Sequence, residues 1–254
     1  MAERRWTVGE GQMNSAPPQQ LQRGVPEPIL RVLELAAVDH SLHVLLDPAE
    51  HARADAFSNT TTRRDFVAGR VAQRLMAAEL LGSEPGDLQS RYWCPDCGLA
   101  PDPSHGRPAY SLHGEPAPLS ISLSRSHGWA LLAMVPAAGV RLGVDLQRIA
   151  DVAFAGFDGV ALSQAEKVLL ADVPPKGQTA WRASVWARKE ALAKVSGLGL
   201  RTEPAGIEAF PSPGSSIRVW EVSAAPSLLP EGFAAAVALS SGAEREGPSG
   251  TTRV

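Results

Sequence analysis

Three side chains that could do chemistry recur at helical spacing near residue 190. Trp186, Glu190 and Lys194 stand four residues apart, so a helix through them would carry an aromatic ring, an acid and a base on one face. An exposed Glu–Lys pair of this kind stabilises a helix by only about 0.2–0.5 kcal/mol. From this stretch alone, a solvated helix face and a catalytic face are both open.

A second acid, Asp145, lies about 45 residues earlier in the apolar run 142–146. Taken alone, it could be a turn or cap residue. If it meets Glu190 at about 4 Å, the two carboxylates repel by about 1 kcal/mol in water and about 4 kcal/mol in a partly buried site, so the pair needs a cation or a proton. Mg²⁺ suits it, because this ion takes one or two carboxylates and completes its shell with waters and substrate phosphates. Lys194 could reach a phosphate as a point charge.

Periodicity and capping predict the elements that must position these residues. We expect a helix from about 179 to 196 ended by Gly197, and a second helix over 63–81 ended by Gly82. The run Ser163-Gln164-Ala165-Glu166 predicts a capping box that opens a short helix. A turn-rich stretch is expected at 106–110, and strands are expected over 42–46, 119–123, 129–135, 142–146, 217–222 and 233–239.

This order of elements predicts an α+β protein with two similar α+β halves, 26–140 and 141–241, each an antiparallel sheet packed with helices. The segments 1–25 and 242–254 lack apolar periodicity and are predicted to be disordered tails. With 24 Lys and Arg against 27 Asp and Glu, the chain has no strongly basic character, so nucleic acid is a poor first guess as a partner. Two cysteines form no disulfide framework, and neither a signal-peptide pattern nor an 18-residue apolar run is present. We therefore expect a soluble cytoplasmic protein without a membrane partner.

The two motifs together resemble a known pair. Gly143-Val144-Asp145 followed by Trp186-Ala187-Arg188-Lys189-Glu190-Ala191-Leu192-Ala193-Lys194 is similar to the signature of the 4′-phosphopantetheinyl transferases. Arg64 with its helix, Gly106-Arg107-Pro108, and the run from Leu123 to Trp129 resemble the upstream motifs of the larger, monomeric Sfp-type members. The resemblance implies a pseudo-twofold arrangement of the two halves.

The resemblance also implies a reaction and its partners. A serine hydroxyl of an apo acyl or peptidyl carrier protein attacks the β-phosphorus of coenzyme A, and 3′,5′-ADP leaves. Asp145, Glu190 and Gln147 would hold Mg²⁺, Glu190 would act as the base, and Lys194 would stabilise charge on the phosphates. Arg64, Arg107, Ser124 and Arg125 are the further candidates for coenzyme A phosphate contacts. Which carrier proteins are served does not follow from the sequence.

Three positions depart from the family pattern. Gln147 stands where many members have a second acid, and its carbonyl can still ligate a hard cation directly or through water. Arg125 replaces the family histidine that lies against the 3′-phosphate of coenzyme A, with a permanent charge. His127 is shifted from that place and is expected to be a surface loop residue. Ala187 replaces a small hydroxyl or thiol residue, a change that we expect to be tolerated.

Several alternatives stay open. Cys94 and Cys97 with His105 give three of the four ligands that a zinc site needs, so a metal knuckle and two thiols in a loop are both possible. Phe154 and Phe157 could form a patch for a carrier-protein helix or could pack in the core. Two other functions compete with transfer: coenzyme A or carrier binding without turnover, and Mg²⁺-dependent nucleotide hydrolysis. Neither a Gly-x-Ser-x-Gly motif nor a phosphate loop is present, which counts against an acyl hydrolase and a P-loop NTPase.

Overall fold

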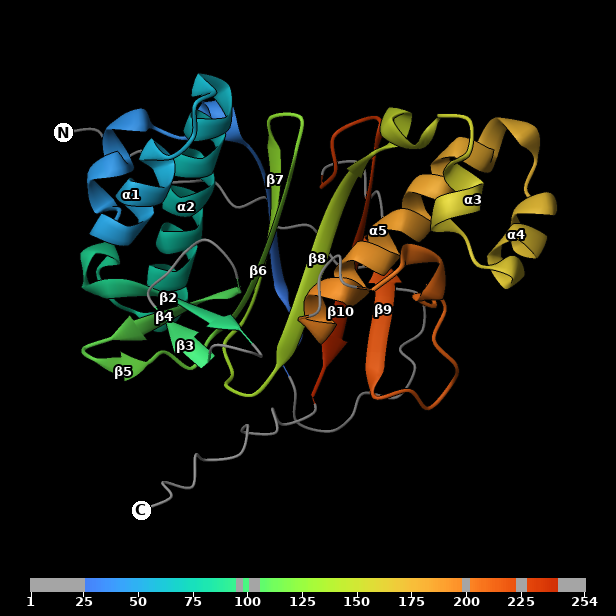
Figure 1. The fold of residues 1–254 in the computed structure, drawn as a ribbon. Helices are drawn as coiled ribbons and strands as arrows, with labels where there is room; N and C mark the ends of the chain where they lie inside the picture. Colours follow the sequence, from blue (N-terminus) through green and yellow to red (C-terminus); the bar gives the residue numbers. More distant parts are fainter. Residues whose placement is uncertain (1–25, 95–97, 101–105, 198–201, 223–227, 242–254) are drawn as a thin grey trace, which may run out of the picture.

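The computed structural model describes residues 26–94, 98–100, 106–197, 202–222 and 228–241. Two three-stranded antiparallel sheets stand next to one another through the middle of the molecule, one with the strand order β1-β7-β6 and the other with the order β8-β10-β9 (Figure 1). Their strands are β1 Ile29–Glu34, β6 Ser120–Ser126, β7 Trp129–Val135, β8 Arg141–Arg148, β9 Ile217–Glu221 and β10 Phe233–Ser240. The mixed α and β architecture with antiparallel sheets is the one expected.

The N-terminal half packs the long helix α2 (Thr60–Leu81) near its sheet and places a shorter helix, α1 (Pro48–Asp55), against α2. Asn59 caps α2 by accepting from the Thr62 amide, and Gly82 ends it in the left-handed conformation. The N-terminal half also contains a four-stranded antiparallel sheet with the order β3-β2-β4-β5, called the second sheet below. Its strands are β2 Leu88–Cys94, β3 Gly98–Ala100, β4 Arg107–Leu112 and β5 Glu115–Pro116.

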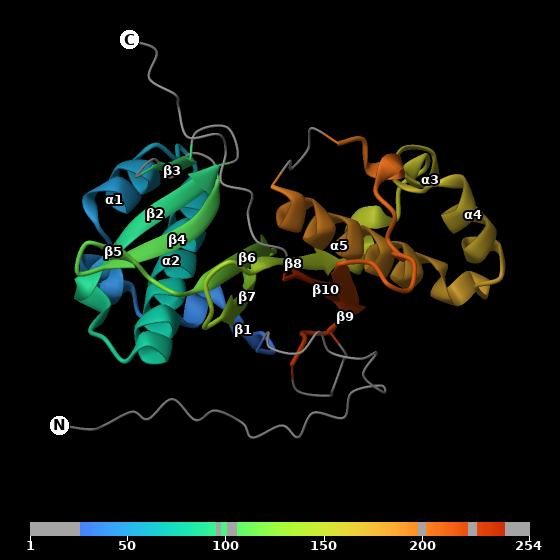
Figure 2. The same ribbon diagram turned by 90° about the horizontal axis from the view of Figure 1, so that it is seen from below.

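The C-terminal half packs one long helix, α5 (Gln178–Ser196), across β8 and β10. Two short helices, α3 (Phe157–Ala161) and α4 (Gln164–Ala171), precede α5 and lie at the end of the molecule far from the N-terminal half (Figures 1 and 2). The capping box at Ser163 and Glu166 is confirmed, as is the helix that ends at Gly197.

The two halves share one strand order. In each, the first strand pairs with the last, and the last pairs with the middle one: β1-β7-β6 and β8-β10-β9. A long helix lies between the first and second strands of each of these sheets, and in the N-terminal half β2 to β5 are inserted between that helix and β6. The twofold relation between the halves stays a prediction, which this shared order supports. The boundaries 26–140 and 141–241 likewise stay an interpretation.

Successive side chains of β8 point alternately to the core and to the site. Leu142, Val144 and Leu146 are buried in a cluster with apolar residues of β7 and β10. Gly143 and Asp145 point to the other face, where α5 lies. On the side of β8 that faces the N-terminal half, the Ser122 hydroxyl of β6 accepts a hydrogen bond from the Val144 amide at 3.0 Å. β8 is therefore held from both halves.

Two expected elements differ in the structure. Residues 42–46, expected as a strand, lie mostly in a 3-10 helix, η2 (His40–Leu45), which the Asp39 side chain caps at Ser41. A short apolar run does not separate a strand from a helical turn. Residues 106–110 are mostly strand β4 rather than turn. The other described 3-10 helices are η1 Leu35–Ala37, η3 Pro85–Asp87, η4 Ile149–Val152, η5 Pro175–Gly177 and η7 Pro204–Gly206. The predicted tails 1–25 and 242–254 fall outside the described residues, and none of the described helices is long and apolar enough to cross a membrane.

Candidate active site

Asp145 is the buried centre of the site. Its side chain projects from β8 toward α5, and the residue is 7% exposed. Its Oδ1 accepts two hydrogen bonds, from the Ser124 hydroxyl of β6 at 2.8 Å and from Lys194 Nζ of α5 at 3.0 Å. The N-terminal half thus supplies one donor and the C-terminal half the other. Among the described residues no donor bonds Oδ2, so this oxygen can accept a further ligand.

Lys194 is fastened to β8 by two contacts. Besides Asp145, its Nζ donates to the Val144 carbonyl at 2.6 Å. The helix can come this close because residue 143 is glycine: a Cβ built there would stand 2.0 Å from the Ala191 carbonyl oxygen and 3.1 Å from Lys194 Cβ. The Gly143-Val144-Asp145 motif therefore combines a place for close helix approach with the acid that the helix meets.

Glu190 lies one turn before Lys194 on α5 and is half-buried. Burial raises its pKa, the negative charge of Asp145 raises it further, and Lys194 opposes both effects. Glu190 therefore lies on the part of α5 that faces Asp145, near enough for the two negative charges to interact. No described residue bonds the Glu190 carboxylate, which leaves it available as a base or as a cation ligand.

Gln147 lies two residues after Asp145 and therefore on the same face of β8. Its amide nitrogen donates to the Arg148 carbonyl at 2.9 Å, so its carbonyl oxygen is the atom that could serve a cation. The described residues contain no cluster of three or more His, Cys, Asp or Glu side chains that could hold a metal alone. Two carboxylates and an amide oxygen fit Mg²⁺, which draws further ligands from water and substrate phosphates.

Lys189, next to Glu190, has a different environment. It is 1% exposed, and its Nζ contacts Glu166 Oε2 at 2.7 Å, the Ala161 carbonyl at 2.8 Å and the Pro204 carbonyl at 2.9 Å. All three ammonium protons therefore have acceptors. Lys189 ties α5 to α3, α4 and η7 rather than facing a ligand. Helical spacing places Lys189 off the face that Glu190 and Lys194 share, but it does not show that Lys189 is buried.

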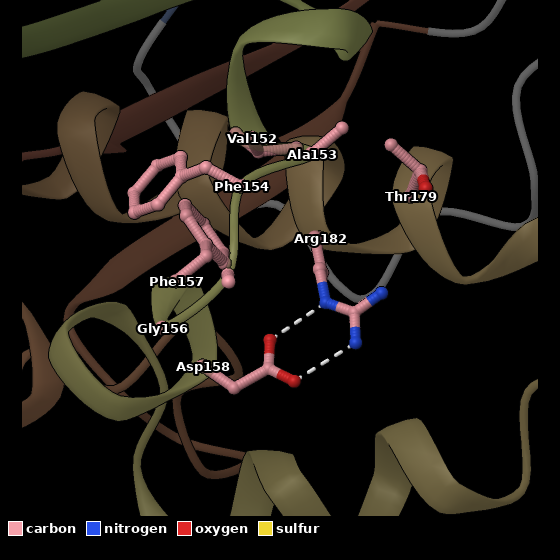
Figure 3. Close-up of a pocket in the computed structure, with 9 residues that line it drawn as sticks. Val152, Ala153, Phe154, Gly156, Phe157, Asp158, Thr179 and Arg182 are labelled. Atoms are coloured by element: carbon pink, nitrogen blue, oxygen red, sulfur yellow. Dashed lines mark hydrogen bonds and ion pairs between the residues drawn. The ribbon is translucent and has the colours of Figure 1, made fainter.

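A row of aromatic contacts connects Trp186, one turn before Glu190, to a pocket at the start of α5. Trp186 is half-buried and packs edge-on against Phe157, with 5.9 Å between ring centroids. Phe157 is buried in the core, whereas Phe154 is 55% exposed and packs against Phe157. Phe154 lines a cavity of about 340 Å³ at the start of α5, and Arg182 binds Asp158 there through two hydrogen bonds (Figure 3). Of the two alternatives, core packing holds for Phe157, whereas the exposed ring of Phe154 remains available to contact a partner.

Two arginines of the N-terminal half meet on one phenyl ring. The guanidinium groups of Arg70, on α2, and Arg125, on β6, lie 5.3 and 5.4 Å from the centroid of the Phe66 ring. The Arg125 stem crosses α2 at Gly69, where a Cβ would stand 3.3 Å from Arg125 Cδ. Partial burial of the guanidinium, and then the charge of Arg70, lower the pKa of Arg125 to about 10. The residue as a whole is exposed and remains a cation at neutral pH.

The remaining predicted residues are more scattered. Arg64 is exposed on α2, 3.9 Å from Asp65. Arg107 is half-buried at the start of β4, paired in register with Trp93. His127 lies in the left-handed turn after β6, exposed and 3.5 Å from Asp151, as expected of a surface loop residue. Cys97 and His105 lie outside the described residues, and with them the question of a zinc knuckle.

Sequence reasoning missed Arg70 and the role of Ser124 as a donor to Asp145. Arg70 follows Phe66 by one helical turn, a spacing that places the pair on one face, but such pairs are common on helices. Alternation along β6 places Ser124 and Arg125 on opposite faces. Ser124 therefore meets Asp145, while Arg125 meets α2. Only the packing of β6 between β8 and α2 shows this division.

Two carboxylates and a lysine held between a strand and a helix are residue types that can bind a divalent cation and a phosphate ester. Residues 141–238 match the family model of the 4′-phosphopantetheinyl transferase superfamily. The matched region covers less than half of the chain, and includes Asp145, Gln147, Glu190 and Lys194 but none of the N-terminal candidates. The match supports the superfamily and, at that level, a coenzyme A-dependent phosphopantetheinyl transferase activity. Comparison of the chain with curated proteins gave no match.

Proposed function

We propose that this protein is an Sfp-type 4′-phosphopantetheinyl transferase, which moves phosphopantetheine from coenzyme A to a serine of an apo acyl or peptidyl carrier protein. The observation that carries the proposal is the meeting of Asp145, Glu190 and Lys194 between β8 and α5, inside the region that matches the superfamily. Ser124, from the other half of the same chain, completes the environment of Asp145. A site completed within one chain supports a monomer.

Asp145 and Glu190 would hold Mg²⁺, with the Gln147 carbonyl oxygen as a third, direct or water-mediated ligand. Two features support the fit: the charge of Asp145 raises the pKa of Glu190, and the second oxygen of Asp145 accepts no hydrogen bond from a described residue. When bound, Mg²⁺ supplies charge neutralisation to the diphosphate of coenzyme A. Because Gln147 carries no charge, we expect weaker Mg²⁺ binding than with an acid at this position.

The reaction needs one proton transfer and one displacement. The carrier serine oxygen forms a bond to the β-phosphorus, the bond from that phosphorus to the bridging oxygen breaks, and 3′,5′-ADP leaves. Glu190, directly or through a water, accepts the serine proton. Lys194 stabilises the negative charge that builds on the bridging oxygen and the α-phosphate.

Arg125 would bind the 3′-phosphate of coenzyme A, and Arg70 would join it. Two guanidinium groups beside one phenyl ring repel one another, and a phosphate group between them would remove that repulsion. Arg64 and Arg107 are the further candidates for phosphate contacts. We assign Ser124 chiefly to orienting Asp145. We place the protein in the cytoplasm with its substrate coenzyme A.

Incubation with coenzyme A, Mg²⁺ and a panel of apo carrier domains tests the proposal. We expect a carrier mass gain of one phosphopantetheine arm, formation of 3′,5′-ADP and a requirement for Mg²⁺. Coenzyme A binding without a mass gain would instead indicate a non-turnover binding protein, and loss of coenzyme A without carrier would indicate a phosphohydrolase. The panel also identifies the carrier class.

Glu190→Gln keeps the shape of the side chain and removes the base, and we expect it to abolish transfer. The matched control is Glu231→Gln, which makes the same change at an exposed residue before β10. Near-normal transfer by Glu190→Gln would refute the assignment of Glu190 as base and ligand.

A further inference from the structure

A short hydrogen-bond relay runs from the core of the N-terminal half to Arg70. Arg70 Nη1 donates to Gln73 Oε1 at 3.0 Å, and Gln73 Nε2 donates to the Tyr110 hydroxyl at 3.3 Å. Gln73 is 1% exposed and Tyr110 is 2% exposed. Gln73 lies on α2 one turn after Arg70, whereas Tyr110 lies on β4. The relay therefore links the helix that carries Arg70 to the second sheet.

The chemistry of the three groups fixes the direction of the relay. Arginine has donors only, so Gln73 must present its carbonyl oxygen to Arg70 and its NH₂ to Tyr110. Tyr110 must then accept with its hydroxyl oxygen. Burial raises the pKa of Tyr110 far above its ordinary value, so the phenol stays protonated at any working pH. No other orientation of the Gln73 amide satisfies both neighbours.

Arg70 needs such a restraint because, among the described residues, little else holds it near Arg125. The positive charge of Arg125 pushes it away, and an unrestrained arginine side chain gains rotamer entropy. Its Nε is buried without a hydrogen-bond partner among the described residues, and its guanidinium group lies over the rings of Phe66 and Tyr92. Ring contacts allow a guanidinium to slide, whereas a hydrogen bond fixes its direction.

We propose that Gln73 and Tyr110 are positioning residues that hold Arg70 beside Arg125, so that the two guanidinium groups meet one phosphate of coenzyme A together. The inference rests on the proposed function, which assigns the 3′-phosphate to Arg125. Neither Gln73 nor Tyr110 touches the substrate. Their effect reaches it only through Arg70, and it concerns only the 3′-phosphate.

Binding of coenzyme A and of 3′-dephospho-coenzyme A to the full-length protein tests this, because only the first ligand carries the phosphate in question. Tyr110→Phe removes one oxygen and keeps the ring, and we expect it to weaken coenzyme A binding by about three- to tenfold. Binding of 3′-dephospho-coenzyme A should stay unchanged, and in transfer assays KM for coenzyme A should rise while kcat stays the same. Gln73→Met, which breaks the relay at its centre, should give the same pattern.

Tyr92→Phe is the matched control. It removes a buried hydroxyl from the same cluster and keeps the ring that contacts Arg70, so it should not change the ratio of the two affinities. In an Arg70→Ala background, Tyr110→Phe should have no further effect on coenzyme A binding. An equal loss for both ligands, or an undiminished effect without Arg70, would show a general structural role and overturn the relay.

The outcomes separate this inference from the proposed function. If the wild-type protein binds neither ligand, the proposed function fails and the relay fails with it. If the wild-type protein transfers phosphopantetheine and Arg125→Ala loses its preference for coenzyme A, but Tyr110→Phe and Gln73→Met keep it, then the proposed function stands and the relay alone is wrong.

Discussion

Gly143→Ala tests how closely α5 must approach β8. The added methyl group would stand 2.0 Å from the Ala191 carbonyl oxygen, 3.0 Å from its carbon and 3.1 Å from Lys194 Cβ. A carbon and an oxygen usually approach to about 3.3 Å, so α5 must retreat by roughly 1.3 Å. Backbone atoms form the clash, and no side-chain rotation relieves it. The retreat stretches the 3.0 Å contact of Lys194 with Asp145 beyond hydrogen-bonding distance.

A displacement of about 1 Å in a catalytic group can lower the rate about 100-fold. We therefore expect kcat/KM for carrier modification, measured by mass spectrometry of the carrier, to fall about 100-fold or more. The overpacked contact should also lower the free energy of unfolding by about 1–3 kcal/mol. Gly159→Ala, in α3, makes the same substitution where a Cβ would have no neighbour within 4 Å, and it should change neither quantity. Wild-type transfer and thermal stability in Gly143→Ala would refute the close approach as the reason for this glycine.

Three further perturbations probe the surroundings of the site. Glu190→Gln, without Mg²⁺ at pH 7, should raise Tm by about one or two degrees, because it removes a carboxylate whose pKa is raised by burial and by Asp145. The gain should vanish as the pH falls through that pKa and the wild-type carboxyl becomes protonated. A gain in Tm that does not depend on pH would contradict this reasoning. Lys189→Met should lower the free energy of unfolding by about 3–5 kcal/mol in urea titrations, because it leaves Glu166 buried without its partner. Adding Glu166→Gln should recover part of that loss, and no recovery would argue against the ion pair as the cause. Gln147→Glu should lower the Mg²⁺ concentration that gives half-maximal transfer, and an unchanged Mg²⁺ dependence would exclude residue 147 from the cation site.

The elements with strong local signals were predictable. The helix α5 and the end of α2 follow from good helix formers and a glycine stop, and the α4 start follows from its capping box. The second sheet was missed, because β2 (Leu88–Cys94) mixes polar and aromatic residues and β4 opens with Arg107-Pro108. The strands of that sheet follow one another along the chain, but their residues lack the alternation of apolar and polar side chains that marks a strand, and β-propensity depends strongly on context.

The site was predictable as a set of residue types but not as a set of contacts. Spacing placed Glu190 and Lys194 on one helix face, and the motif resemblance brought Asp145 to them. The direct contact of Lys194 with Asp145 was not expected, because the lysine was assigned to phosphate. Helical spacing separates Lys189 from the face shared by Glu190 and Lys194, but only the packing of α3, α4 and η7 shows that Lys189 is buried.

The buried lysine explains how the site keeps its geometry. Consecutive helix residues point about 100° apart, so Lys189 and Glu190 cannot both face β8. Lys189 points to α3, α4 and η7, where Glu166 and two carbonyls bind it. These contacts fix the rotation of α5 about its own axis. Gly143 fixes the distance of the same helix from β8. One contact therefore sets the angle and the other sets the separation, and together they determine where Glu190 and Lys194 stand relative to Asp145.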